Sequence, residues 1–182
     1  MTSEAFLRLL RRYSVTAVAD VRSVPYSRYV PHFNQDSLSG SLRSNGIKHV
    51  PLGGLLGARP DNPACYREGK ISYQLLSSTP AYQEGITRLL KGCETEIIAV
   101  MCTEKDPINC HRMVLISETL INECNQDISH IHDTGDIETH QEALQRLAAL
   151  HHLDQPTLWD DSSRFQEALQ LQEARIAYTL PK

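Results

Sequence analysis

Two short segments carry most of the side chains that could do chemistry. The first, Asp20-Val21-Arg22-Ser23, offers an acid, a base and a hydroxyl, and the second, Cys102 to Arg112, adds thiols, carboxylates, a histidine and an arginine. Each begins at the end of an apolar run typical of a buried strand, and ligands of open parallel sheets gather at the carboxyl ends of strands. We therefore expect one shared pocket, lined by Asp20, Arg22, Glu104 and Arg112.

The carboxylates and the thiols suggest two kinds of catalysis. Asp20 and Glu104 are candidate general bases, because a partly desolvated crevice raises the pKa of a carboxylate; ion pairing with Arg22 and Arg112 is the structural alternative. His111 is a candidate proton donor or phosphate contact. Cys102 and Cys110 are candidate nucleophiles, although buried cysteines are also common in cores. A helix starting at Pro107 would place Cys110, His111 and Arg112 in its first turn, where the helix dipole attracts anions and lowers a thiol pKa.

The basic residues are concentrated between positions 22 and 70. This stretch carries a local charge of +4 within a chain whose net charge is −4. Arginines and lysines interleaved with aromatic rings suit nucleic-acid binding, in which cations contact phosphates and rings stack on nucleobases. A solvated, charged surface is the simpler explanation of the same residues. The candidate phosphate- or substrate-binding residues are Arg22, Ser23, Tyr26, Arg28, Tyr29, Phe33, Arg43, Cys110 and Arg112.

Metal and cofactor sites are not expected. Adjacent Cys110 and His111 would point about 100° apart on a helix, and no fourth ligand is evident. The sequence contains no Walker loop, GxGxxG, HExxH or GxSxG motif. The ten-residue separation of Cys102 from Arg112 also differs from the short spacing of a cysteine phosphatase loop.

Alternating helix and strand signals predict an α/β fold whose parallel strands are joined by crossover helices. A helix capped by Ser3 runs to Tyr13. Further helices are expected over 35–44, 79–90, 107–121, 138–151 and 163–178, and strands over 16–21, 47–52, 96–102 and 127–132. Breaker-rich segments predict an ordered loop over 25–34, a long loop over 53–78 and a bend over 154–161.

The whole chain resembles one soluble, cytoplasmic domain. Its 182 residues fall within the usual size of one domain. No apolar run is long enough to span a membrane, and no signal-peptide pattern is present. Five cysteines without CxxC spacing favour reduced thiols. We expect a single α/β domain over 1–182, with a core over about 3–132 and C-terminal helices over 136–180; the sequence leaves the oligomeric state open.

The order and spacing of several motifs resemble the domain of unknown function 488 family. They are Asp20-Val21-Arg22-Ser23-Val24-Pro25, His32-Phe33-Asn34, Leu52-Gly53-Gly54, Cys102-Thr103-Glu104 and Cys110-His111-Arg112. The resemblance implies a Rossmann-like, three-layer domain with a mostly parallel sheet flanked by helices. Members usually begin with an extra strand ending in Gly-His-Ser, a feature that the residues before this first helix lack.

Together these features favour an enzyme that processes a nucleic-acid base. The most concrete form is a glycosylase-like hydrolase of an N-glycosidic bond in modified or damaged DNA. Asp20 or Glu104 would orient water or stabilise an oxocarbenium-like centre. Arg22 and Arg112 would hold phosphates, and Tyr26, Tyr29 or Phe33 would stack an extruded base. Two other interpretations remain open. One is a cysteine-dependent enzyme; the other is a non-catalytic module that binds a nucleotide or nucleic acid.

Overall fold

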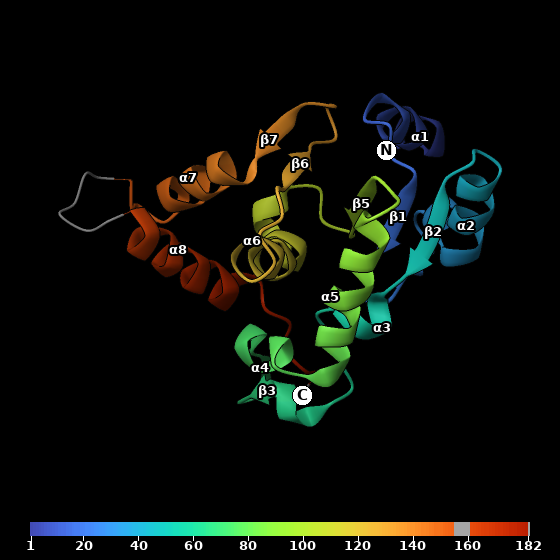
Figure 1. Ribbon diagram of the computed structural model, residues 1–182. Coiled ribbons are helices and arrows are strands. Elements are labelled where there is room, and N and C mark those ends of the chain that lie inside the picture. The colour runs from blue at the N-terminus through green and yellow to red at the C-terminus, as the bar shows by residue number, and fades with distance from the viewer. Residues whose placement is uncertain (155–160, 182) are drawn as a thin grey trace. The chain divides into compact units, whose positions relative to one another are not determined.

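The computed structural model describes residues 1–154 and 161–181 (Figure 1). The chain divides into two compact units. The first unit comprises Met1–Cys65 and Gln74–Thr103, and the second comprises Tyr66–Tyr73 and Glu104–Lys182. The expected single domain over 1–182 therefore remains a prediction. No helix among the described residues is long and apolar enough to cross a lipid bilayer.

The first unit is built on a three-stranded parallel sheet. The strands β1 (Ala17–Asp20), β2 (Lys48–Pro51) and β5 (Ile98–Met101) lie in the order β2-β1-β5. All three were expected, over 16–21, 47–52 and 96–102. The central strand is fully buried, and its last residue, Asp20, pairs in register with Pro51 on one side and Met101 on the other. The strand order reverses between β1 and β5, so this sheet has a topological switch point at the end of β1.

Helices cover both faces of this sheet. Residues of α1 (Ser3–Arg12) and α2 (Gln35–Arg43) pack with Val18 in one hydrophobic cluster that includes Ala99 and Met101. Side chains alternate along a strand, so Ile98 faces the other way, towards Gly92 of α5 (Pro80–Cys93). The mixed α/β architecture is therefore confirmed as helices around a small parallel sheet.

The ends of these helices differ in detail from the prediction. Thr2, rather than Ser3, caps α1, because its side chain accepts a hydrogen bond from the Ala5 amide. Thr79 caps α5 with Pro80 in the first turn, as the sequence suggested. However, α5 extends beyond Gly92 to Cys93.

The segment over 53–78 is not the long loop that its glycine and proline residues suggested. It contains the short helix α3 (Gly53–Leu56), a 3-10 turn (Pro63–Cys65), the two-residue strands β3 (Tyr66–Arg67) and β4 (Lys70–Ile71), and α4 (Tyr73–Ser77). The antiparallel hairpin β3–β4 turns at Gly69, which has a φ of +79°. One of the boundaries between the two units falls within α4. Short elements of this kind have too few residues for a periodic signal.

The second unit contains a hairpin and a series of helices. A 3-10 turn (Pro107–Asn109) precedes a π-helical segment (Arg112–Ser117), which continues into α6 (Glu118–Asn122). The strand expected over 127–132 exists as β6 (Ser129–Ile131), but it pairs antiparallel with β7 (Ile137–Thr139). The expectation of a fourth parallel strand is therefore wrong, because a short turn joins β6 to β7 and allows direct hairpin pairing.

Two helices complete the second unit. The expected helices over 138–151 and 163–178 are present as α7 (His140–Leu150) and α8 (Asp161–Ile176), which pack against each other (Figure 1). Thr139 and Glu142 form a capping box at the start of α7. The bend predicted over 154–161 lies mostly outside the described residues.

Candidate functional site

Asp20, at the end of β1, is held by an arginine two positions later in the chain. The Arg22 Nε and Nη2 atoms donate to Asp20 Oδ1 and Oδ2 over 2.8 and 2.6 Å, and the Arg22 amide donates to Oδ1 over 3.1 Å. His49 Nε2, from β2, lies 3.4 Å from Oδ2. The carboxylate is only 2% exposed. The ion-pair alternative considered for Asp20 is therefore what the structure shows.

This geometry reverses the expected electrostatics of Asp20. Burial alone would raise the pKa of its carboxyl group, but hydrogen bonds from Arg22 and His49 and the arginine charge outweigh burial and lower the pKa to about 2. The expectation of a raised pKa is wrong for this residue, because Arg22 binds both carboxylate oxygens and His49 adds a further contact. A buried carboxylate that accepts several hydrogen bonds is suited to positioning Arg22 rather than to taking a proton from a substrate.

Arg22 in turn anchors the loop over 24–34. Its Nη1 atom donates to the Phe33 carbonyl oxygen over 2.9 Å, and Asn34 Oδ1 accepts from the Ser27 amide over 2.6 Å. The Phe33 ring packs edge-on against Phe6, with the ring centroids 5.4 Å apart. Phe33 was expected to stack on a base, but its ring belongs to the hydrophobic packing of α1 and instead fixes the loop.

Between these anchors the loop presents two tyrosines to solvent. Tyr26 is 71% exposed and Tyr29 is 80% exposed. The Arg28 guanidinium lies 5.1 Å from the centroid of the Tyr29 ring, within the range of a cation–π contact. Arg28 and Arg43 are exposed and form no ion pair with a carboxylate of the described residues, whereas Arg22 and Lys48 are paired with acids.

Two glycines allow the chain after β2 to pass close behind this strand end. A Cβ atom on Gly53 would lie 2.0 Å from the Arg22 carbonyl oxygen, and one on Gly57 would lie 2.4 Å from Ser23 Oγ. The Ser23 hydroxyl oxygen accepts a hydrogen bond from the Arg59 amide over 3.1 Å. The Leu52-Gly53-Gly54 motif therefore supports the Arg22-Ser23 backbone directly.

In the second unit, a thiol and a carboxylate of the predicted set meet. Cys110 Sγ donates to Glu104 Oε2 over 3.5 Å and lies 3.8 Å from His111 Nδ1. Glu104 is exposed, whereas Cys110 and His111 are buried. Arg112 Nη2 donates to the carbonyl oxygens of Glu104 and Lys105 over 2.9 and 3.1 Å, so this guanidinium also shapes the segment.

Two expectations about this segment are wrong. Cys110 is not in the first turn of a helix, because its backbone is extended and the helix starts after it. For the same reason Cys110 and His111 do not point apart. The expected absence of a metal remains a prediction.

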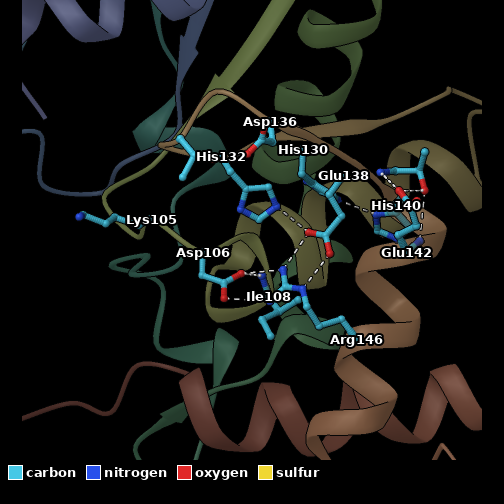
Figure 2. A network of polar contacts seen from close by, with 12 residues as sticks. Lys105, Asp106, Ile108, His130, His132, Asp136, Glu138, His140, Glu142 and Arg146 are labelled. Atoms are coloured by element: carbon cyan, nitrogen blue, oxygen red, sulfur yellow. Dashed lines mark hydrogen bonds and ion pairs between the residues drawn. The ribbon is translucent and has the colours of Figure 1, made fainter.

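An ion-pair network lies beside the Asp106–Cys110 turn (Figure 2). Arg146, from α7, donates through two nitrogens to Asp106 over 2.9 Å each, and to Glu138 over 2.7 and 2.8 Å. His132 Nε2 lies 2.9 Å from Glu138 Oε2. Hydrogen bonds from Arg146 lower the pKa of both Asp106 and Glu138 despite partial burial, so both carboxylates remain ionised at neutral pH.

A second network joins a glutamate to two buried histidines. His140 Nε2 lies 2.6 Å from Glu118 Oε1, and His140 Nδ1 lies 3.1 Å from His130 Nε2. Burial lowers the pKa of His130 to about 4, and the charges of His140 and Arg112 act in the same direction. His140 thus contacts Glu118 through one ring nitrogen and His130 through the other, so each of these nitrogens has a hydrogen-bonding partner.

The structure brings together only part of the predicted site. Asp20, Arg22 and Cys102 belong to the first unit, where Asp20 and Cys102 leave the same edge of the sheet, while Glu104 and Arg112 belong to the second. The shared pocket remains a prediction. Sequence reasoning missed several residues that hold the two segments, although His49, within the strand expected over 47–52, was a visible signal. These residues are His49, Gly57, Asp106, Arg146 and Gln172.

The comparisons with known families and proteins identify a family but no activity. Comparisons with curated proteins and with solved structures gave no significant match. The sequence profile described as "Domain of unknown function DUF488" matches residues 2–119, which include both segments and the complete parallel sheet. The chain belongs to the DUF488 family.

Proposed function

We propose that the first unit binds single-stranded or locally unpaired nucleic acid through the loop over 24–34. The observation that carries the proposal is the Tyr29 ring, which is 80% exposed and has the Arg28 guanidinium 5.1 Å from its centroid. Aromatic rings that are open to solvent stack on any base, and a neighbouring arginine adds a phosphate contact or a cation–π contribution. A duplex hides its base faces, so this surface favours unpaired strands.

The anchoring of the loop supports this proposal. Arg22 and Asn34 hold the two ends of the loop, and Asp20 and His49 hold Arg22. A fixed loop presents its rings without the entropy cost of ordering them during binding. Asp20 and Arg22 are therefore positioning residues for Tyr26 and Tyr29 in this proposal.

Fluorescence anisotropy with a labelled oligonucleotide, alone and as a duplex, tests the proposal. We expect tighter binding to the single strand and a loss of about tenfold for Tyr29→Leu, since stacking contributes about 1–3 kcal/mol per base. Arg8→Ala removes an exposed charge from α1 and serves as the control, with nearly unchanged affinity. Absence of binding at low salt, or equal affinity of Tyr29→Leu and wild type, would reject the proposal.

A second proposal concerns hydrolysis of the N-glycosidic bond of a bound base. Glu104 is the better candidate carboxylate, because it is exposed, whereas Asp20 is buried and paired. Its contact with the Cys110 thiol fixes one of its oxygens. The buried Cys110 thiol is closed to a substrate, which argues against a cysteine nucleophile at this position.

Release of free base from oligonucleotides that contain uracil, alkylated or oxidised bases tests this second proposal. We expect Glu104→Gln to abolish release while preserving binding, because it removes transition-state stabilisation but few ground-state contacts. Asp20→Asn should instead weaken binding by loosening the loop. Cys102→Ser and Cys110→Ser should be mild. If no probe releases base, or if either serine variant alone is inactive, hydrolysis by Glu104 is rejected and the binding proposal remains.

We also propose that the first unit has a Rossmann-like fold and that the protein is cytoplasmic. Parallel strands in the order β2-β1-β5, with helices on both faces, support a Rossmann-like relationship for the first unit. Five cysteines that form no disulfide support a reducing, cytoplasmic location.

A further inference from the structure

The turn between Asp106 and Cys110 determines how the second segment is displayed. It consists of one 3-10 turn, Pro107–Asn109, followed by the extended residue Cys110. Asp106 caps the turn by accepting a hydrogen bond from the Ile108 amide over 3.3 Å. So short a turn has few internal hydrogen bonds, and its conformation depends on partners elsewhere in the fold.

One of these partners is Gln172 of α8. Its side chain is completely buried, and its Nε2 atom donates to the Ile108 carbonyl oxygen over 2.7 Å and to Asn109 Oδ1 over 3.0 Å. The Gln172 Oε1 atom lies 2.9 Å from His151 Nε2, at the end of α7. A single buried amide thus connects the turn to both C-terminal helices.

The other partner is Arg146 of α7. Its guanidinium binds both oxygens of Asp106, the residue that caps the turn, and also binds Glu138 of β7 (Figure 2). Arg146 therefore fixes the start of the turn, while Gln172 fixes its middle. Both lie beyond residue 119, where the match to the DUF488 family ends.

We infer that α7 and α8 act as a clamp on the Asp106–Cys110 turn, through Arg146 and Gln172. The clamp holds the backbone on which Cys110 meets Glu104, so Arg146 and Gln172 are positioning residues for that thiol–carboxylate contact. In this way a part of the chain outside the family match sets the local geometry of a motif inside it.

Two buried cysteines make the clamp measurable in the full-length protein. Cys65 and Cys110 are each 1% exposed, but Cys65 belongs to the first unit and Cys110 to the turn. Alkylation by iodoacetamide, followed by mass spectrometry, gives a separate rate for each thiol. Gln172→Met keeps the volume of the side chain and removes its hydrogen bonds, and Gln170→Met makes the same change at an exposed position of the same helix.

We expect Gln172→Met to raise the alkylation rate of Cys110 by about tenfold or more, because a carbonyl oxygen left without its donor favours local opening of the turn. The Cys65 rate should stay at the wild-type value in both variants, and Gln170→Met should change neither rate. Arg146→Met should raise the Cys110 rate in the same direction. Parallel acceleration of Cys65 and Cys110, or an unchanged Cys110 rate in Gln172→Met, would overturn the clamp.

A double-mutant cycle distinguishes positioning from general support of the fold. Glu104→Gln should change the pH profile of Cys110 alkylation in the wild-type background but change it much less in Gln172→Met, where the thiol and the carboxylate are no longer held together. Equal effects in the two backgrounds would show that Gln172 does not position this contact. The measurement involves no nucleic acid, so its failure would leave the binding proposal intact.

Discussion

Arg22 closes a bidentate ion pair on Asp20, two positions before it in the chain, and uses its remaining terminal nitrogen to bind the Phe33 carbonyl oxygen. A strand end is thereby tied to the far end of the exposed loop over 24–34. We expect Arg22→Lys to lower the free energy of unfolding by about 3 kcal/mol, because a lysine cannot make the three contacts at once and leaves Asp20 incompletely paired.

Urea unfolding measures this loss, and hydrogen exchange locates it. The Ser27 amide, which donates to Asn34, should lose protection in Arg22→Lys, while amides of α5 should be affected only through the global stability. A uniform loss of protection over the first unit would contradict a specific link between Arg22 and the loop.

Acid should remove the contribution of Asp20 in a defined pH range. The pKa of this carboxyl group is lowered from 3.8 to about 2, so its stabilisation is fully present above pH 3.8 and is lost as the pH falls through about 2. The shift corresponds to about 2 kcal/mol of unfolding free energy. Urea unfolding between pH 5 and pH 2 should show this loss in the wild type. In Asp20→Asn the free energy of unfolding should depend correspondingly less on pH over this range.

Protonation of buried His130 should change the stability of the protein in a higher pH range. The pKa of His130 is lowered from 6.5 to about 4, so below pH 6.5 the unfolded chain takes up a proton that the folded protein resists. Stability should therefore fall by about 3 kcal/mol as the pH drops from 6.5 to 4. His130→Gln should flatten the dependence in this range, whereas His152→Asn, at an exposed position, should not. A wild-type stability that is constant from pH 7 to pH 4 would contradict the buried, neutral state of His130.

Two neighbouring glycines of α3 should respond oppositely to alanine. Gly53→Ala would place a methyl group 2.0 Å from the Arg22 carbonyl oxygen and should cost about 3 kcal/mol, because backbone rather than a flexible side chain must move. Gly54→Ala meets no atom within 4 Å and should be neutral or stabilising by up to about 1 kcal/mol. Thermal unfolding of the two variants tests the prediction, and equal melting temperatures would contradict the close approach of α3 to Arg22.

The exposed arginines Arg28 and Arg43 should determine how nucleic-acid binding depends on salt. For a single strand, each neutralised phosphate contributes about −0.7 to the slope of log affinity against log salt. Arg28→Ala and Arg43→Ala should each flatten the slope by roughly that amount. Arg8→Ala should leave it nearly unchanged. A slope that none of the three variants alters would mean that these arginines do not contact phosphates.

The sequence by itself determined the elements with long or well-bounded signals. Apolar runs before Asp20 and Cys102 identified β1 and β5, and helical spacing identified α1 and α5; helices were also expected where α2, α7 and α8 lie. The motifs around Asp20-Val21-Arg22-Ser23 and Cys110-His111-Arg112 also identified the family. These features are local, because propensity, periodicity and spacing are properties of short stretches of chain.

Only the tertiary structure decided which partners the chemical groups have. The lowered pKa of Asp20 depends on how Arg22 folds back and on His49 from another strand, and the packing of Phe33 depends on Phe6. Strand 129–131 shows the same limit, since its apolar pattern fits a parallel sheet or a hairpin equally well. Gln172 and Ile108 are 64 residues apart in sequence, and a buried amide acquires a role only when the fold places a carbonyl oxygen beside it.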